Sequence, residues 1–499
     1  MTEPTQPAAP VDDVSQFGYK AEMKRELGPF QSFAMAFGFV SIATGTFTSY
    51  SAMLGTSGPM GVWTWLIVII GQLMVALIFG GLAARIPVSG YSYQWVSRLA
   101  NPVLGWIMGW VTFTFLAIVV LAVDYTIASA ILPNLFGYAG TNLNALIITA
   151  VVVASQSGLV MWSTHYTQRL NSIAVIIQII GIGSVVVLLY AVGFFKGAFD
   201  WSMVFNTGAI PREGYFGFGS LTHAGPFIMG TLAGAFTIVG FESAANMAEE
   251  TRDAVHVIPK AMRQAVIALG VIGFAFVLGA TALIKDPIAL ADSPTALADI
   301  ITTALGPVAG KALLVLIVIS IYSCGLTITV SGSRQVWAMA RDERFPGWQW
   351  LRKVNRATNT PMNAALFMMI VSEAILLAFG FSTGVLFAFF SAATLLPAMI
   401  YAGTTLLYIV KRRQLPPTDG FKLGRWELPV LSVASVWLIY ELLIFRDASF
   451  ASAWLYIAIF FLIGGLYLAY LFLKRGSRGL DMPELSDIDQ ELDKLGQQA

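Results

Sequence analysis

The sequence contains few of the residues that carry catalysis or bind metal ions. Among its 499 residues are one cysteine, Cys324, and three histidines. One cysteine cannot form a disulfide within the chain, and one cysteine with three histidines leaves little scope for metal or nucleophilic chemistry. HExxH, GxSxG and P-loop motifs do not occur. We therefore expect this chain not to be an enzyme, and we predict that it uses no cofactor.

Charged residues are also scarce. Asp, Glu, Lys and Arg make up 11% of the chain, whereas soluble proteins average about 25%. Hydrophobic residues account for 57%, and the mean hydropathy is +0.73. Water could not solvate such a chain as a globule, so we predict a membrane protein surrounded by the lipid bilayer. The net charge of +1 says nothing about an acidic partner, and we expect no nucleic-acid partner.

Twelve segments are apolar and long enough to cross a bilayer, which takes about 20 residues per helix. They lie at 30–56, 62–84, 102–133, 143–163, 169–196, 227–249, 263–285, 307–341, 361–380, 385–411, 428–446 and 452–474. The predicted fold class is therefore an all-α membrane protein with twelve transmembrane helices.

The distribution of basic residues predicts which side of the membrane each connecting segment faces. With the N-terminus inside, 24 of the 29 Lys and Arg residues fall on the cytoplasmic side. Cytoplasmic loops carry an excess of these residues, so the assignment is consistent. We predict a multi-pass protein of the plasma membrane, monomeric or homodimeric, with both termini in the cytoplasm.

The first and sixth predicted spans are interrupted near their centres. In 30–56 the apolar pattern gives way to Ser41, Ile42, Ala43, Thr44, Gly45 and Thr46, a stretch rich in residues of poor helix propensity. In 227–249 it breaks around Gly240, Phe241, Glu242 and Ser243. These spans begin two five-helix halves, 30–196 and 227–411, so we predict inverted repeats with a binding site between them. Close helix packing through glycine is the alternative.

A helix that is broken within lipid has backbone groups that need partners. The N-terminus of a half-helix favours a carboxylate, and the freed carbonyls favour an ammonium group. An amino acid carries both groups, so it is the substrate that this arrangement favours. Choline, ethanolamine and polyamines lack the carboxylate and are the alternatives.

Three groups of residues carry a resemblance to a known family. They are 240–244 (GFESA) with 248–251 (AEET) and 258–261 (IPKA), then 331–334 (SGSR) with 338–342 (AMARD), and IP and GYSY within 86–93. Taken together along the chain, these groups resemble the amino acid–polyamine–organocation (APC) superfamily of transporters. The resemblance extends from Leu27 to about Lys474. Residues 57–65 (SGPMGVWTW) are similar to its amino acid/choline transporter branch.

This resemblance implies the fold of the leucine transporter, a 5+5 inverted repeat with peripheral helices at 428–446 and 452–474. The expected function is that of a secondary active transporter, or permease, that works by alternating access. The chain then divides into a disordered cytoplasmic tail at 1–26, a transporter domain at 27–474 and a cytoplasmic tail at 475–499. A channel or a sensor built on this fold is the remaining alternative.

The resemblance also implies a substrate site at the centres of the two broken helices. Thr44 and Gly45 are expected to offer N–H groups to the carboxylate, and Ser41, Phe236 and Val239 to offer carbonyls to the amine. Phe236 occupies the position of an aromatic gate, which can attract an ammonium group; plain core packing is the alternative. The full predicted set is Ser41, Ile42, Ala43, Thr44, Gly45, Phe236, Val239 and Gly240.

The coupling ion stays open at this point. Gln178 stands where several proton-coupled relatives carry a lysine, and a glutamine neither takes up nor releases protons. Sodium could instead be held by Ala43, Ser320, Ser323 and Thr327, although such hydroxyls more often serve helix packing. Gln178 could also fill that place in an uncoupled exchanger, or Glu242 could carry protons.

Charged residues near the spans are candidates for specific roles, because placing an ionisable group at membrane depth costs free energy. Glu242 is expected to couple protons or to tie the broken helix to a neighbour, and the second role is favoured. Asp124 is predicted near the outer end of its span, as a solvated carboxylate, with attraction of cationic substrates as the alternative. A charge network is predicted to close the inner side, with solvated helix ends as the alternative; its members are Arg334, Arg341, Asp342, Glu249 and Glu250.

Overall fold

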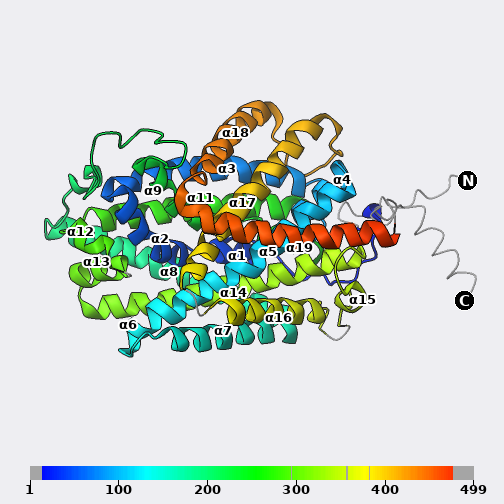
Figure 1. Ribbon diagram of the computed structural model, residues 1–499, viewed down its shortest axis with the longest axis horizontal. Coiled ribbons are helices and arrows are strands. Elements are labelled where there is room, and N and C mark those ends of the chain that lie inside the picture. The colour runs from blue at the N-terminus through cyan, green and yellow to red at the C-terminus, as the bar shows by residue number, and fades with distance from the viewer. Residues whose placement is uncertain (1–13, 294, 356–357, 381–382, 476–499) are drawn as a thin grey trace, which may run out of the picture.

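The computed structural model describes residues 14–293, 295–355, 358–380 and 383–475, and most of these residues are helical (Figure 1). The first half of the bundle contains α1 (Pro29–Val40), α2 (Ile42–Ser57), α3 (Thr64–Ala83), α5 (Pro102–Thr126), the π-helical turn η3 (Ile127–Ile131), α6 (Leu132–Phe136), α7 (Asn142–Trp162) and α8 (Thr164–Phe195). The second half contains α9 (Pro226–Thr237), α10 (Ser243–Asn246), η5 (Ala248–Glu250), α11 (Ala254–Thr281), α14 (Pro307–Arg341), α16 (Met362–Phe379) and α17 (Thr383–Lys411). Then follow α18 (Glu427–Ile444) and α19 (Ala451–Arg475).

Short helices cover the two ends of the bundle. Figure 1 places α4 (Tyr91–Leu99) and α15 (Trp348–Leu351) at one end, and α12 (Pro287–Ala291) and α13 (Ala296–Leu305) at the other. We call these the α4 end and the α13 end. Because the long helices run between them, each end corresponds to one face of the membrane.

Local sequence signals explain where several long helices begin. Asn101 accepts a hydrogen bond from the N–H of Leu104, and Pro102 follows it as the first residue of α5. Thr141 and Ser163 cap α7 and α8 in the same way. Such caps satisfy N–H groups that have no partner inside the helix.

Within the described residues, eleven helical segments are long and apolar enough to cross a membrane. They match eleven of the twelve predicted spans, and the all-α membrane fold is therefore confirmed. The predicted span 227–249 differs, because α9 has only 12 residues and is followed by an irregular segment before α10. A total of twelve crossings stays a prediction.

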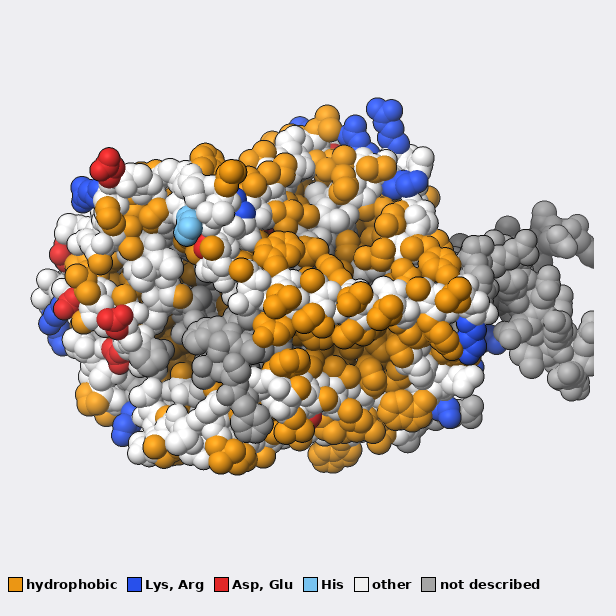
Figure 2. Space-filling model, viewed as in Figure 1, with side chains coloured by type: hydrophobic (Ala, Val, Ile, Leu, Met, Phe, Trp, Pro, Cys, Tyr) orange, Lys and Arg blue, Asp and Glu red, His pale blue; other side chains and the backbone are white. Residues whose placement is uncertain are grey.

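The surface also fits a membrane protein. Large hydrophobic side chains are exposed along α3, α7, α8, α18 and α19, among them Ile70, Val151, Ile180, Val436 and Leu466. In Figure 2 hydrophobic side chains cover the middle of the visible face, and most of the visible Asp and Glu lie toward the α13 end. Lipid rather than water suits this middle band.

Residues 14–26 differ from the predicted disordered tail. Val14–Phe17 form a 3₁₀ turn, and Tyr19 and Met23 are buried, with exposed fractions of 5% and 6%. The N–H of Glu26 donates to the carbonyl of Glu250 at 3.0 Å. This segment is ordered by contacts with residues of the folded domain, such as those of Tyr19 with Asp342 and Arg341. Local composition does not reveal such contacts. Residues 1–13 and 476–499 lie outside the described residues.

Candidate functional site

Ser41 alone separates α1 from α2. Its backbone has φ 40° and ψ 103°, and a positive φ is uncommon for a residue other than glycine. Its Oγ accepts hydrogen bonds from Oγ1 of Thr44 and from Nε2 of Gln178 in α8, both at 2.7 Å. The predicted break in the first span is thus present but confined to one residue, since Ile42 already begins α2. The side chain of Gln178 therefore contacts this break directly.

The N–H groups near the break are arranged as follows. Gly45 donates to the carbonyl of Ser41 at 3.1 Å, and Thr44 donates to Ser41 Oγ at 3.3 Å. Both groups predicted to meet a carboxylate therefore have local partners. Ile42 and Ala43, the first two residues of α2, have no intrahelical carbonyl to pair with. The positive end of the α2 dipole lies at these buried residues.

The second break spans Ile238–Glu242, between the end of α9 at Thr237 and the start of α10 at Ser243. Gly240 has φ 90°, and its N–H donates to Oη of Tyr401 in α17 at 2.9 Å. The same hydroxyl donates to Oε2 of Glu242 at 2.8 Å. This bridge ties the broken segment to α17, which is the contact expected if Glu242 has a structural role.

The two breaks pack against one another through glycines. A Cβ on Gly45 would overlap the side chain of Thr237, the last residue of α9, and a Cβ on Gly240 would overlap the ring of Phe39 in α1. Ser243 Oγ donates to the carbonyl of Met35 at 3.0 Å. The close packing considered as an alternative for these glycines is therefore present together with the breaks.

A cavity of about 640 Å³ leads from the α13 end toward the breaks. Its walls come from α2, α5, η3, α9, α12 and α17. Phe236 lines it half-buried, and Val239, three residues further along, is 6% exposed. Clefts of this size commonly hold small molecules. The aromatic ring predicted as a gate therefore lies between this cavity and the second break.

The hydroxyls predicted as possible sodium ligands do not share one centre. Ser323 Oγ and Thr327 Oγ1 donate to Oδ1 of Asn171 in α8, at 2.7 and 3.1 Å. Ser320 Oγ donates to the carbonyl of Leu316 within its own helix, at 2.8 Å. The amide of Asn171 also donates to the carbonyl of Ala34 in α1, at 3.1 Å. Asn171 therefore links α1, α8 and α14, and sequence reasoning missed it although a buried amide within an apolar span is itself a signal.

Two buried ion pairs join α14 to the segment after the second break. Arg341 Nη1 and Nη2 lie 2.8 and 3.0 Å from the carboxylate oxygens of Glu249. Arg334 contacts both oxygens of Glu250, at 2.9 and 3.3 Å. All four side chains are at most 8% exposed. These are the pairs that the predicted charge network requires.

The N-terminal segment completes this network at the α4 end. Oδ1 of Asp342 accepts a hydrogen bond from Tyr19 at 2.8 Å, and Oδ2 accepts one from Tyr93 at 2.6 Å. The guanidinium of Arg341 lies 3.6 Å from the ring centre of Tyr19. Burial and then the nearby Asp342 carboxylate raise the pKa of Tyr19 to about 12, so its hydroxyl stays a donor. Sequence reasoning did not identify Tyr19, because its partners Asp342 and Arg341 lie more than 300 positions away.

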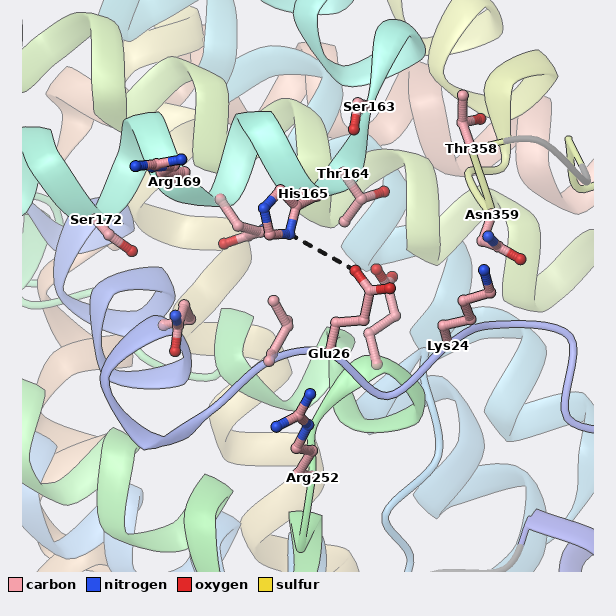
Figure 3. Close-up of a pocket in the computed structure, with 14 residues that line it drawn as sticks. Lys24, Glu26, Ser163, Thr164, His165, Arg169, Ser172, Arg252, Thr358 and Asn359 are labelled. Atoms are coloured by element: carbon pink, nitrogen blue, oxygen red, sulfur yellow. Dashed lines mark ion pairs between the residues drawn. The ribbon is translucent and has the colours of Figure 1, made fainter.

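A second cavity, of about 730 Å³, opens beside this closure (Figure 3). Lys24, Arg169 and Arg252 give it basic walls, and His165 lies 3.7 Å from Glu26 across it. Gln168 and Ser172 of α8 also line it, and their buried polar side-chain atoms have no hydrogen-bond partner within the described residues. Gln168, Asn171, Ser172 and Gln178 form a polar row along one face of α8. This row leads from the cavity to Ser41.

Asp124 lies elsewhere than the sequence predicted. Its side chain is fully buried, and Oδ1 accepts a hydrogen bond from Nε2 of Gln156 in α7 at 2.9 Å. The carboxylate packs on Gly325, near the centre of α14. The prediction of a solvated carboxylate near the helix end is therefore wrong. It failed because α5 continues through η3 and α6 to Phe136, which places Asp124 deep in the bundle.

Comparison with known proteins identifies the family. A model of the amino acid permease family matches residues 27–474. Amino-acid permease BAT1 of Arabidopsis thaliana is 26% identical over 454 residues, which cover 85% of this chain and 86% of that protein. The GABA-specific permease of Saccharomyces cerevisiae is 25% identical over 438 residues, which cover 85% of this chain and 76% of that protein. These matches confirm the resemblance to the APC superfamily. The chain belongs to the amino acid permease family and is a multi-pass membrane transporter of amino acids, not an enzyme.

Proposed function

We propose that this chain is a secondary active transporter that moves an amino acid across the plasma membrane by alternating access. The α4 end faces the cytoplasm, with both termini, and the α13 end faces outward. The distribution of Lys and Arg supports this orientation. The cavity at the α13 end is then the route by which the solute arrives.

The observation that carries the proposal is the meeting of two broken helices below that cavity. The carboxylate of the solute binds at the N-terminus of α2, to the N–H groups of Ile42 and Ala43 with the hydroxyl of Thr44. Its amine binds to carbonyls of the second break, near Phe236 and Val239, and the ring of Phe236 closes over it. Two half-helix ends of opposite polarity thus select a zwitterion.

Transport then requires the closure at the α4 end to open. In this proposal the first, second, sixth and seventh spans rock against the third, fourth, eighth and ninth. The ion pairs of Arg341 with Glu249 and of Arg334 with Glu250 join these two groups of helices. Breaking them opens a path along the polar row of α8, through which the solute leaves.

The substrate is proposed to be an amino acid whose two charged groups can reach both breaks. One relative is named a GABA-specific permease, so the test includes a longer amino acid of that kind. Choline, ethanolamine and polyamines form the second candidate class. They would leave the N–H groups of Ile42 and Ala43 without an anionic partner.

Uptake into proteoliposomes tests the substrate class. The purified full-length protein is supplied with labelled α-amino acids, γ-aminobutyrate, choline, ethanolamine and putrescine, with and without sodium and a pH gradient. We expect uptake of at least one amino acid, and protein-free liposomes serve as the control. Strong uptake of choline with none of any amino acid would refute the proposed substrate. Uptake that ignores both ions but rises with internal substrate would identify an exchanger.

A further inference from the structure

Asp124 is a buried carboxylate that none of the roles above employs. Its Oδ1 accepts the Gln156 amide, while Oδ2 has no hydrogen-bond partner among the described residues. Oε1 of Gln156 is likewise buried without a partner there. Both side chains pack against Gly325, where an added Cβ would lie 2.6 Å from Asp124 Oδ1 and 2.9 Å from Gln156 Oε1. Two acceptors without donors among the described residues therefore share one small buried site between α5, α7 and α14.

The described surroundings supply no cation to balance an ionised carboxylate here. None of the ion pairs found among the described residues includes Asp124. From α7 comes the uncharged Gln156, and from α14 the thiol of Cys324, which interacts electrostatically with the carboxylate. The neighbouring helix α16 carries one ionisable residue, Glu373, and no Lys or Arg. An isolated charge at this depth is strongly disfavoured, so the neutral acid is the stable form in this conformation.

The site of Asp124 is also close to the first helix break and to the cavity at the α13 end. Cys324, next to Gly325, donates to the carbonyl of Phe39 at 2.9 Å, two residues before the break in the first span. On the other side, Tyr125 and Thr126, which follow Asp124 directly, line the cavity of the α13 end. The helix then changes to the π-helical turn η3, and such turns are frequent at functional sites. Asp124 is thus within a few residues of both the cavity at the α13 end and the helix break at Ser41.

We propose that Asp124 is the proton-carrying group that couples amino acid transport to a proton gradient. Oδ2 takes up one proton from the solution at the α13 end while that cavity is open, and it releases the proton toward the α4 end after the conformational change. This rests on the proposed function above. A proton supplies the donor that the two orphan acceptors lack, whereas a hard metal cation takes about six oxygen ligands. The neutral acid permits tight packing on Gly325, and its ionised form favours the conformation in which water reaches it.

The test compares four variants of the full-length protein in proteoliposomes, with the amino acid that the uptake panel identifies. Asp124→Asn removes the titratable group, Asp124→Glu keeps it, and Glu242→Gln and Glu373→Gln each remove a different carboxylate within the spans. Two quantities are measured: accumulation driven by an acidic exterior, and exchange of labelled for unlabelled substrate without a gradient. An internal pH dye records proton entry that depends on substrate.

We expect Asp124→Asn to lose gradient-driven accumulation at least tenfold and to lose substrate-dependent proton entry, while exchange continues. Asp124→Glu should keep both with a shifted pH dependence, and Glu373→Gln should match the unaltered protein. Accumulation by Asp124→Asn equal to that of the unaltered protein would overturn the proposal. So would a loss of coupling in Glu242→Gln alone.

Two further outcomes stay informative. If Asp124→Asn is monodisperse but carries out neither reaction, substrate binding is measured in detergent across pH. Binding by the unaltered protein that varies with pH, and binding by the variant that does not, supports the proposal; equal pH dependence in both refutes it. If the unaltered protein exchanges amino acids but does not respond to a pH gradient, only the proposal that Asp124 couples transport to protons is refuted. If the unaltered protein moves no amino acid at all, the proposed function itself fails.

Discussion

The ion pair between Arg341 and Glu249 gives the most direct test of how the α4 end closes. The two side chains make paired hydrogen bonds of 2.8 and 3.0 Å and are 8% and 3% exposed. Reversing either charge alone, as Arg341→Glu or Glu249→Arg, places two like charges in this buried site. Reversing both restores one charge of each sign.

The expected magnitude follows from burial. Removing one partner of a buried ion pair costs about 3–5 kcal/mol, and each 1.4 kcal/mol changes an equilibrium about tenfold. Each single reversal should therefore shift the balance away from the closed α4 end by about two to three and a half orders of magnitude. The double reversal should recover only part of this. It does not restore the hydrogen bond from the N–H of Ser89 to Glu249, nor the stacking of Arg341 on Tyr19 and Trp337.

A single-cysteine reporter measures this shift. Cys324 is the only cysteine of the chain, so Cys324→Ala gives a background without thiols. Gln168→Cys then places one thiol on the wall of the cavity beside the closure, at a position that is 2% exposed. We expect its labelling by a polar maleimide in detergent to accelerate at least about tenfold in each single reversal. The double reversal should label more slowly than either.

The reasoning is refuted if the two reversals act independently. A double variant whose labelling and uptake defects equal the sum of the single effects, within about 0.5 kcal/mol, would show no coupling between the residues. Unchanged labelling in both single variants would show that this pair does not hold the α4 end closed.

Three further predictions concern stability, read as the melting temperature of the purified protein. Gly240→Ala should destabilise by about 2 kcal/mol or more, because alanine is strained at φ 90° and its Cβ overlaps an aromatic ring of α1. Tyr401→Phe should cost about 1–3 kcal/mol and slow transport, because it leaves the N–H of Gly240 and the carboxylate of Glu242 without their shared partner. Partial burial raises the pKa of Asp447, but hydrogen bonds from backbone N–H groups outweigh burial and lower it. Its stabilising effect is thus present above about pH 4 and lost as the pH falls through the lowered pKa, so the melting curves of the unaltered protein and Asp447→Asn should converge in acid.

Controls separate the intended causes from general damage. Gly137 has φ 71° but no atom near its Cβ position, so Gly137→Ala measures backbone strain without overlap and should cost less than Gly240→Ala. A smaller loss for Gly240→Ala than for Gly137→Ala would contradict the packing argument. An unchanged melting temperature for Tyr401→Phe would show that the bridge to α17 contributes little. Melting curves for Asp447 that stay apart in acid would show that its carboxylate does not act by ionisation.

Much of the fold was predictable because membrane burial acts on composition and span length. Eleven of the predicted spans coincide with long apolar helices, since each needs about 20 apolar residues whatever its neighbours are. Both helix interruptions were also predictable, because residues of poor helix propensity interrupt the apolar pattern near Ser41 and Gly240. The length of each break could not be predicted from the sequence. It depends on which neighbour satisfies the freed groups, such as Tyr401 at the second break.

The sequence by itself thus determined a membrane transporter of permease type, the places where two helices break and the residues near them. Tertiary structure alone decided which side chains meet. It buried Asp124 against Gly325, brought Tyr19 to Asp342 and Arg341, and joined three helices at Asn171. Hydropathy records how much of a segment prefers lipid to water, which is a property of each residue. Pairing, burial and charge balance depend on residues far apart in the chain, and only packing brings those together.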